Sequence, residues 1–235
     1  MMTTQIKKNN FGTLIIMTVA TLIFFPLIIL WTAGKWNWME GWLFAIWFDA
    51  MVLSNMIYLY FKDPALLAER SKKPGSDNQK SWDKYLLIGA YVMFMLWFIL
   101  MPLDAIRFGW SPEFPIWLKI LGGLLLLPSL YFIYQATAQN TYLSTMVRIQ
   151  EERKQKVIST GVYGFVRHPL YLGCVLMLAG APLLLGSFIG LGISLIALAV
   201  LIYRIIGEEK MLLSELDGYE KYKIKVRYRL VPFVW

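Results

Sequence analysis

Residues 170–206 read LYLGCVLMLAGAPLLLGSFIGLGISLIALAVLIYRII, an apolar run with one charged side chain, Arg204. A transmembrane helix needs roughly 20 apolar residues to cross about 30 Å of hydrocarbon, so this run is too long for one crossing. Gly186 and Ser187 near its middle are turn-forming residues. The run therefore predicts two spans joined by a tight helix-turn-helix.

Four more apolar runs precede this stretch and match the length of a membrane span: residues 11–33, 42–61, 85–103 and 116–137. The composition agrees, with 58% hydrophobic and 16% charged residues and a mean hydropathy of +0.54. A soluble domain with so much apolar surface would aggregate. We predict one all-α membrane domain over residues 1–235, a polytopic bundle of about six transmembrane helices.

Along the chain, connections with many Lys and Arg residues alternate with connections that have few. This alternation gives an independent test of the number of spans. Rich connections are cytoplasmic by the positive-inside rule, so both termini are predicted to be cytoplasmic. The net charge of +8 then reflects residues beside the membrane, and nucleic acid is not an expected partner. With one His and one Cys, the chain gives no indication of a metal site. The rich connections are the segment before the first span, 62–80, 148–167 and 210–229.

Two polar clusters flank the last pair of spans. His168 and Pro169 open the fifth span, where free N–H groups and the positive helix end suit an anionic group. Arg204, Glu208 and Glu209 lie near the end of the sixth, and Arg204 and Glu208 share a helix face. Ionisable residues at membrane depth indicate function. Each cluster also has an interpretation without function. His168 would then only mark the membrane interface, and Glu208 would lie on a helix end that has already left the bilayer.

Together these clusters resemble the isoprenylcysteine carboxyl methyltransferase family, which belongs with the membrane phospholipid methyltransferases. The resemblance covers residues 140–235, while the first four spans match only in being apolar. It is carried by Tyr163, Arg167-His168-Pro169, Tyr171, Gly173, Glu208-Glu209 and a tail motif of Gly218, Tyr219 and Tyr222.

The resemblance implies methyl transfer from S-adenosyl-L-methionine, with residues 1–137 as four apolar spans and 138–235 as the cofactor-binding catalytic core. Arg204 would face the methyl acceptor and Glu208 would contact the cofactor, and these two are the implied catalytic residues. Gln155 stands where some members carry His, a change that backbone contacts would tolerate. The implied cofactor-binding residues are Gln150, Gln155, Lys156, Val157, Ile158, Tyr163, His168, Pro169, Leu170, Tyr171, Glu208 and Glu209.

Two other functions stay open on the sequence alone. An NADPH-dependent sterol-reductase-like enzyme has a similar HP-x-Y element, but that family has Asn where this chain has Leu170, and it has more spans. A lipid-binding membrane protein without catalysis would keep the same fold. The expected partners are the bilayer and a lipidic or small acceptor with a carboxylate, thiol or amine. The acceptor and the oligomeric state are not fixed by the sequence.

The alternation of basic connections predicts a multi-pass protein whose active site faces the cytoplasm. Reporter fusions placed after Lys8, Lys80, Lys154 and Trp235 should all report the cytoplasmic side. A reporter after Lys80 that signals the opposite side would contradict this topology.

Overall fold

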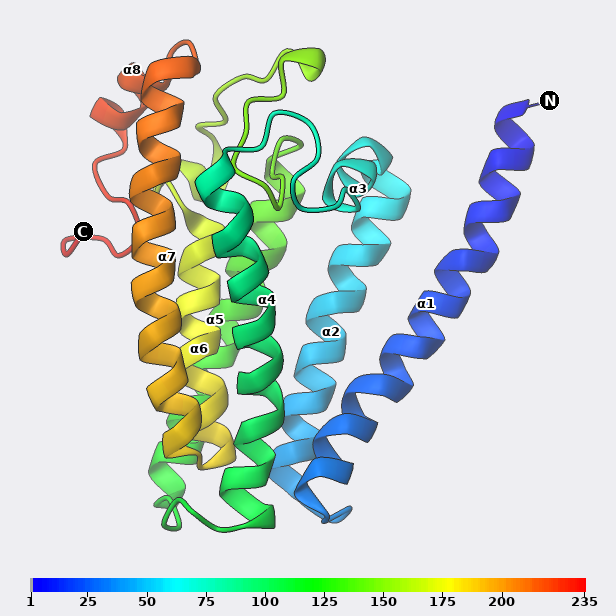
Figure 1. The fold of residues 1–235 in the computed structure, drawn as a ribbon, viewed down its shortest axis with the longest axis vertical. Helices are drawn as coiled ribbons and strands as arrows, with labels where there is room; N and C mark the ends of the chain where they lie inside the picture. The colour runs from blue at the N-terminus through cyan, green and yellow to red at the C-terminus, as the bar shows by residue number, and fades with distance from the viewer. Residues whose placement is uncertain (1) are drawn as a thin grey trace.

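A computed structural model describes the backbone of residues 2–235 and the side chains of residue 12 and of residues 14–235. The side chains of the basic segment before the first predicted span, including Lys8, and of Phe11 at the start of that span lie outside that description. The chain forms a bundle of long helices with short helices and loops gathered at one end (Figure 1). The elements are α1 (Met2–Ala33), α2 (Met39–Lys62), α3 (Pro64–Arg70), α4 (Ser81–Pro102), α5 (Ile116–Gln139), α6 (Pro169–Leu185), α7 (Phe188–Glu215) and α8 (Tyr219–Lys225).

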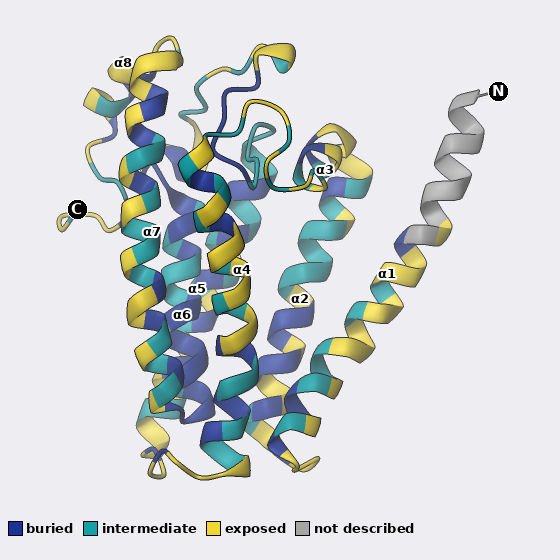
Figure 2. Cartoon of the chain, viewed as in Figure 1, coloured by how far each residue is buried: buried dark blue, intermediate teal, exposed yellow. Residues whose placement is uncertain are grey.

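The predicted all-helical membrane fold is confirmed. Five of the described helices are long and apolar enough to cross a bilayer. The remaining apolar helix, α6, has 17 residues, about 25 Å at 1.5 Å per residue, a little under the bilayer's ~30 Å core. The outward faces of α1, α4 and α7 carry many exposed residues (Figure 2). Large apolar side chains such as Ile16, Trp31 and Leu195, each 70% exposed, give these faces the character of lipid-facing surface.

The predicted bend between α6 and α7 lies at the expected residues. Gly186 ends α6 with a φ of +79°, a left-handed conformation that favours glycine. Ser187 caps α7 by accepting a hydrogen bond of 2.8 Å from the Gly190 N–H. The buried Asp104 carboxylate accepts hydrogen bonds from the hydroxyls of Ser187 and Ser111, at 2.6 and 2.7 Å. The bend is therefore fixed by backbone conformation and by one buried acid.

Helix α7 is longer than the apolar run in the sequence predicted. Its apolar stretch ends near Ile206, but the helix continues to Glu215. Its 28 residues span about 42 Å, longer than the hydrocarbon core. Arg204, Glu208 and Glu209 therefore lie within the helix rather than at its end, on rigid backbone near the polar loops.

Helices α5 and α6 pack closely because small residues lie between them. A side chain at Gly122 would meet the backbone nitrogen of Leu184 and, at 2.6 Å, the carbonyl oxygen of Gly180. The Ser129 hydroxyl donates to the Gly173 carbonyl at 2.7 Å across the same interface. Small residues and interhelical hydrogen bonds are typical contacts between membrane helices. The pairing fixes where α6 begins, and its first turn forms part of the site described below.

Gly122→Ala should destabilise the bundle because the new methyl group meets the α6 backbone, which cannot rotate away. We expect a loss of about 1–3 kcal/mol, the usual range for overpacking, seen as a lower midpoint of thermal unfolding in detergent. Gly123→Ala is the matched control, since its methyl group would lie 4.0 Å from its nearest neighbour across the interface, a flexible Leu184 side-chain carbon. Equal midpoints for the two variants would contradict the close approach.

Candidate active site

A cavity of about 360 Å³ lies where α6, α7 and α8 meet the polar loops. Its wall includes the start of α6, the loop segment 155–158, and side chains of α4, α7 and α8. The volume is within the usual range of small-molecule pockets, ~300–1,000 Å³. Residues from both halves of the chain meet here, including Leu87 and Tyr91 of α4.

A buried ion cluster holds the start of α6 against α7 and the C-terminal segment. Glu209 is 3% exposed, and its carboxylate accepts hydrogen bonds from Arg167 Nε at 2.6 Å and Arg229 Nε at 2.7 Å. His168 Nε2 lies 3.3 Å from the same carboxylate. The backbone N–H of His168 donates to the Arg229 carbonyl at 2.9 Å. Glu209 is thus surrounded by three bases and does not line the cavity.

Glu208 points the other way, into the cavity. Its carboxylate accepts a hydrogen bond of 2.8 Å from the hydroxyl of Tyr171, and both residues line the cavity. Successive helical residues differ by about 100° in direction, which explains why the adjacent acids Glu208 and Glu209 have separate surroundings. A carboxylate with one such bond keeps capacity to accept more from a ligand.

Arg204 also lines the cavity, but its charge is already paired. Its Nε donates to the buried Asp83 carboxylate at 2.7 Å, and a terminal nitrogen donates to the Thr145 carbonyl. Among the described residues no ion pair joins Arg204 to Glu208, although they share a helix face. The carboxylate of Asp83 accepts from the Val147 N–H at 2.8 Å as well, so it fixes the loop as well as the arginine.

The segment 155–158 lies along the cavity as the resemblance implied, whereas Gln150 does not. Gln150 is fully buried and bonds within its own loop, donating to the Tyr142 carbonyl at 2.8 Å and accepting from Arg153 at 2.8 Å. Its backbone N–H donates to the Gln155 side chain at 2.9 Å. Gln150 therefore shapes the loop behind the cavity.

Three tyrosines close the cavity on the side of α8. Burial raises the pKa of Tyr163, whose hydroxyl lies 3.2 Å from the Ala136 carbonyl. Tyr222 donates to the Tyr163 carbonyl at 2.8 Å. Tyr219 is 4% exposed and lines the cavity, yet its hydroxyl has no hydrogen-bond partner in the described part of the chain. A buried hydroxyl without a partner is costly, so a further polar atom at this position would be stabilising.

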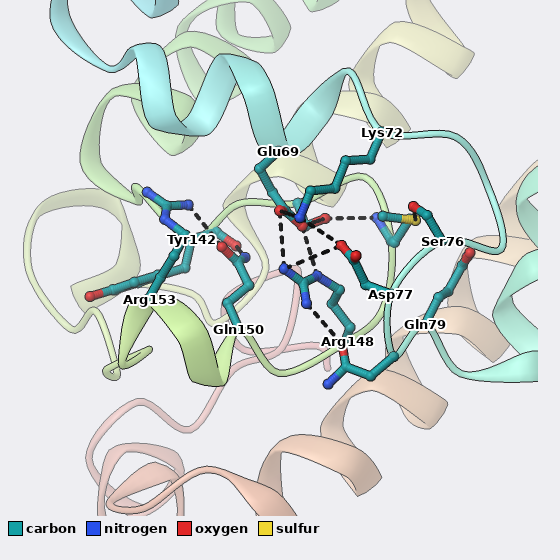
Figure 3. A network of polar contacts seen from close by, with 12 residues as sticks. Glu69, Lys72, Ser76, Asp77, Gln79, Tyr142, Arg148, Gln150 and Arg153 are labelled. Carbon is teal, nitrogen blue, oxygen red and sulfur yellow. Dashed lines mark hydrogen bonds and ion pairs between the residues drawn. The ribbon is translucent and has the colours of Figure 1, made fainter.

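A polar network joins the end of α3 and the segment after it to the loop 140–153 (Figure 3). Arg148 donates to both oxygens of Glu69, at 2.8 and 3.1 Å, and both side chains are 2% exposed. Burial alone would raise the pKa of Glu69, but hydrogen bonds from Arg148, Lys72 and Ser144 lower it to about 2. The carboxylate therefore stays charged at physiological pH, and the ion pair with Arg148 persists.

The structure brings most of the implied residues together and separates two. Gln150 and Glu209 support the wall from behind. Arg70, Asp83 and the Tyr219 hydroxyl were not proposed as site residues from the sequence. Of these, Asp83 could have been noticed, because it is an acid in the first turn of the apolar helix α4. The implied residues that line the cavity are Gln155, Lys156, Val157, Ile158, Tyr163, His168, Pro169, Leu170, Tyr171, Arg204 and Glu208.

The fold defines a polytopic helical membrane protein with a cavity at one end of its bundle. Residues 118–214 match the model of the isoprenylcysteine carboxyl methyltransferase (ICMT) family. The protein-S-isoprenylcysteine O-methyltransferase of Schizosaccharomyces pombe (strain 972 / ATCC 24843) is 35% identical over 85 residues, 35% of this chain and 36% of that protein. The match thus spans little more than a third of the curated relative. The part of the chain from α5 to α7 is thus similar to the ICMT family.

The adjacent acids on α7 provide a test of these assignments. Glu209→Gln leaves the buried Arg167 and His168 and the partly exposed Arg229 without a carboxylate, which should cost about 3–5 kcal/mol. Glu208→Gln loses one charge-assisted bond from Tyr171 and should cost about 1–2 kcal/mol. Thermal unfolding in detergent compares the two proteins directly. A Glu208→Gln protein as unstable as Glu209→Gln would contradict the assignment.

Proposed function

We propose that this protein is an S-adenosyl-L-methionine-dependent methyltransferase that methylates the carboxylate of a prenylated cysteine. The observation that carries the proposal is the cavity, because residues assigned to the cofactor by family resemblance line one wall of it. The relative in Schizosaccharomyces pombe is an O-methyltransferase by name, which supports an oxygen acceptor over a thiol or an amine. In the predicted topology the cavity belongs to the cytoplasmic side.

The groups in the cavity fit such a cofactor. Glu208 offers a carboxylate near the expected positive charge of a sulfonium and an amino group, and Tyr219 offers a hydroxyl with no other described partner. Val157 and Ile158 give an apolar wall beside the polar backbone of their loop. When bound, S-adenosylmethionine supplies a methyl group activated on a sulfonium, and sulfur keeps the electron pair as the acceptor oxygen takes the methyl carbon.

The protein's part in the reaction is to position the two reactants and to exclude water. An acceptor carboxylate is already ionised at neutral pH, so no side chain has to remove a proton. His168 fits this view, since its Nε2 faces the buried Glu209 and not an open position. Holding donor and acceptor in line can supply much of the rate, because it removes the entropy of bringing them together.

The proposal is tested with purified protein, radiolabelled S-adenosylmethionine and N-acetyl-S-farnesyl-L-cysteine as the acceptor. Label should enter the acceptor as a base-labile methyl ester. S-adenosylhomocysteine should bind saturably, and Glu208→Gln should weaken it about tenfold or more, the usual effect of losing a contact with a charged group.

Glu215→Gln is the matched control, because Glu215 lies on the same helix and pairs with Lys80 at 2.6 Å, outside the cavity lining. It should bind S-adenosylhomocysteine like the unmodified protein. Saturable binding of NADPH with no binding of S-adenosylhomocysteine would contradict the proposal and favour a reductase.

A further inference from the structure

Arg70 is a cavity-lining arginine whose charge has no acidic partner among the described residues. It is the last residue of α3, and its side chain lines the cavity. Its guanidinium donates one hydrogen bond, of 3.3 Å, to the Leu143 carbonyl. No ion pair to Arg70 exists among the described side chains. A guanidinium has five N–H donors, so most of its capacity is unused.

The other arginines that line the cavity differ from Arg70, because each has an acidic partner. Each of them donates to a buried carboxylate at close range: Arg148 to Glu69, Arg167 to Glu209 and Arg204 to Asp83. Glu69, next to Arg70 in the sequence, faces away from it and is occupied by Arg148, Lys72 and Ser144. Arg70 is thus the cavity arginine that the protein itself leaves unneutralised.

The surroundings of Arg70 are poorly solvated. The residue is half-buried, and burial lowers its pKa. Taking a cation out of water without a counter-ion is costly, whereas a bidentate carboxylate matches the planar guanidinium well. An anionic group of a ligand would therefore bind here more strongly than at the arginines already paired.

Arg70 also lines a second hollow, of about 300 Å³, between α2, α3 and α5. This hollow is mainly apolar, and its lining is Met51, Val52, Asn55, Met56, Leu59, Leu67, Arg70, Ser71 and Ile133. Of these residues Arg70 is shared with the first cavity. The guanidinium therefore stands between the cavity assigned to the cofactor and an apolar space among helices that face lipid.

We propose that Arg70 binds the carboxylate of the methyl acceptor, whose prenyl chain occupies the apolar hollow between α2, α3 and α5. The inference rests on the proposed function. It moves the acceptor contact from Arg204, whose Nε is held by Asp83, to a residue outside the segment that matches the family. Methylation removes the acceptor's charge, so the ester product loses its contact with Arg70 and is released.

The alternative partner for Arg70 is the carboxylate of the cofactor. A cofactor has no long apolar chain to place in the second hollow, whereas a prenylated acceptor has one. The two sources of a carboxylate make opposite predictions for binding of S-adenosylhomocysteine, which needs no acceptor.

The test measures binding of N-acetyl-S-farnesyl-L-cysteine and of its methyl ester, without methyl transfer. The unmodified protein should prefer the acid over the ester by about tenfold or more, as expected for one charge-assisted contact. Arg70→Met should abolish this preference, and Arg70→Lys should retain part of it. Affinity for S-adenosylhomocysteine should stay unchanged in both variants. Arg107→Met, an exposed arginine in the connection after α4, is the control and should keep the full preference.

An acid preference that survives in Arg70→Met would overturn the proposal. So would a tenfold loss of S-adenosylhomocysteine affinity in that variant, because Arg70 would then serve the cofactor. If Arg70→Met does not fold, the ratio in Arg70→Lys decides, with an undiminished acid preference counting against the proposal. If the unmodified protein transfers no methyl group, the proposed function is wrong. The Arg70 proposal is still tested in that case, because the acid-to-ester ratio is measured by binding and not by turnover.

Discussion

The carboxylate of Glu209 is the contact on which the site depends. It draws together Arg167 and His168 at the start of α6 and Arg229 in the C-terminal segment. A buried charge is tolerated only when its partners are in place, so these three parts of the chain are held in one arrangement. Glu208 then faces the cavity because Glu209 faces the cluster. The geometry of the cavity is therefore a consequence of a structural ion cluster that itself lies outside it.

Two further ion pairs make the first part of the chain a component of the site. Glu69 of α3 holds Arg148, and Asp83 of α4 holds Arg204 and the N–H of Val147. The division into four spans (1–137) and a catalytic core (138–235) stays a prediction from resemblance, but the cavity draws its lining from both sides of it. Helices α3 and α4 therefore contribute side chains to the cavity wall. Glu69 and Asp83 both lie outside residues 118–214, the part of the chain that matches the family model.

The sequence predicted the helices well because apolar length is a local property. The five long spans and the bend at Gly186 and Ser187 follow from runs of hydrophobic residues and from turn chemistry. Partners distant in sequence could not be predicted in this way: Arg204 pairs with Asp83, 121 residues away, although Glu208 lies one helical turn away. The roles of Gln150 and Glu209 were likewise invisible, since only the folded chain shows which polar atoms are already satisfied.

The central claim is that the cavity beside α6, α7 and α8 holds the cofactor, and photolabelling tests it most directly. An S-adenosylhomocysteine analogue with an azide on adenine would be irradiated with the purified protein, and the labelled peptides would be identified by mass spectrometry. The account predicts label on the peptide that contains residues 155–158, removed by excess S-adenosylhomocysteine. Label removed by the same competitor but confined to α1 or α2 would contradict it.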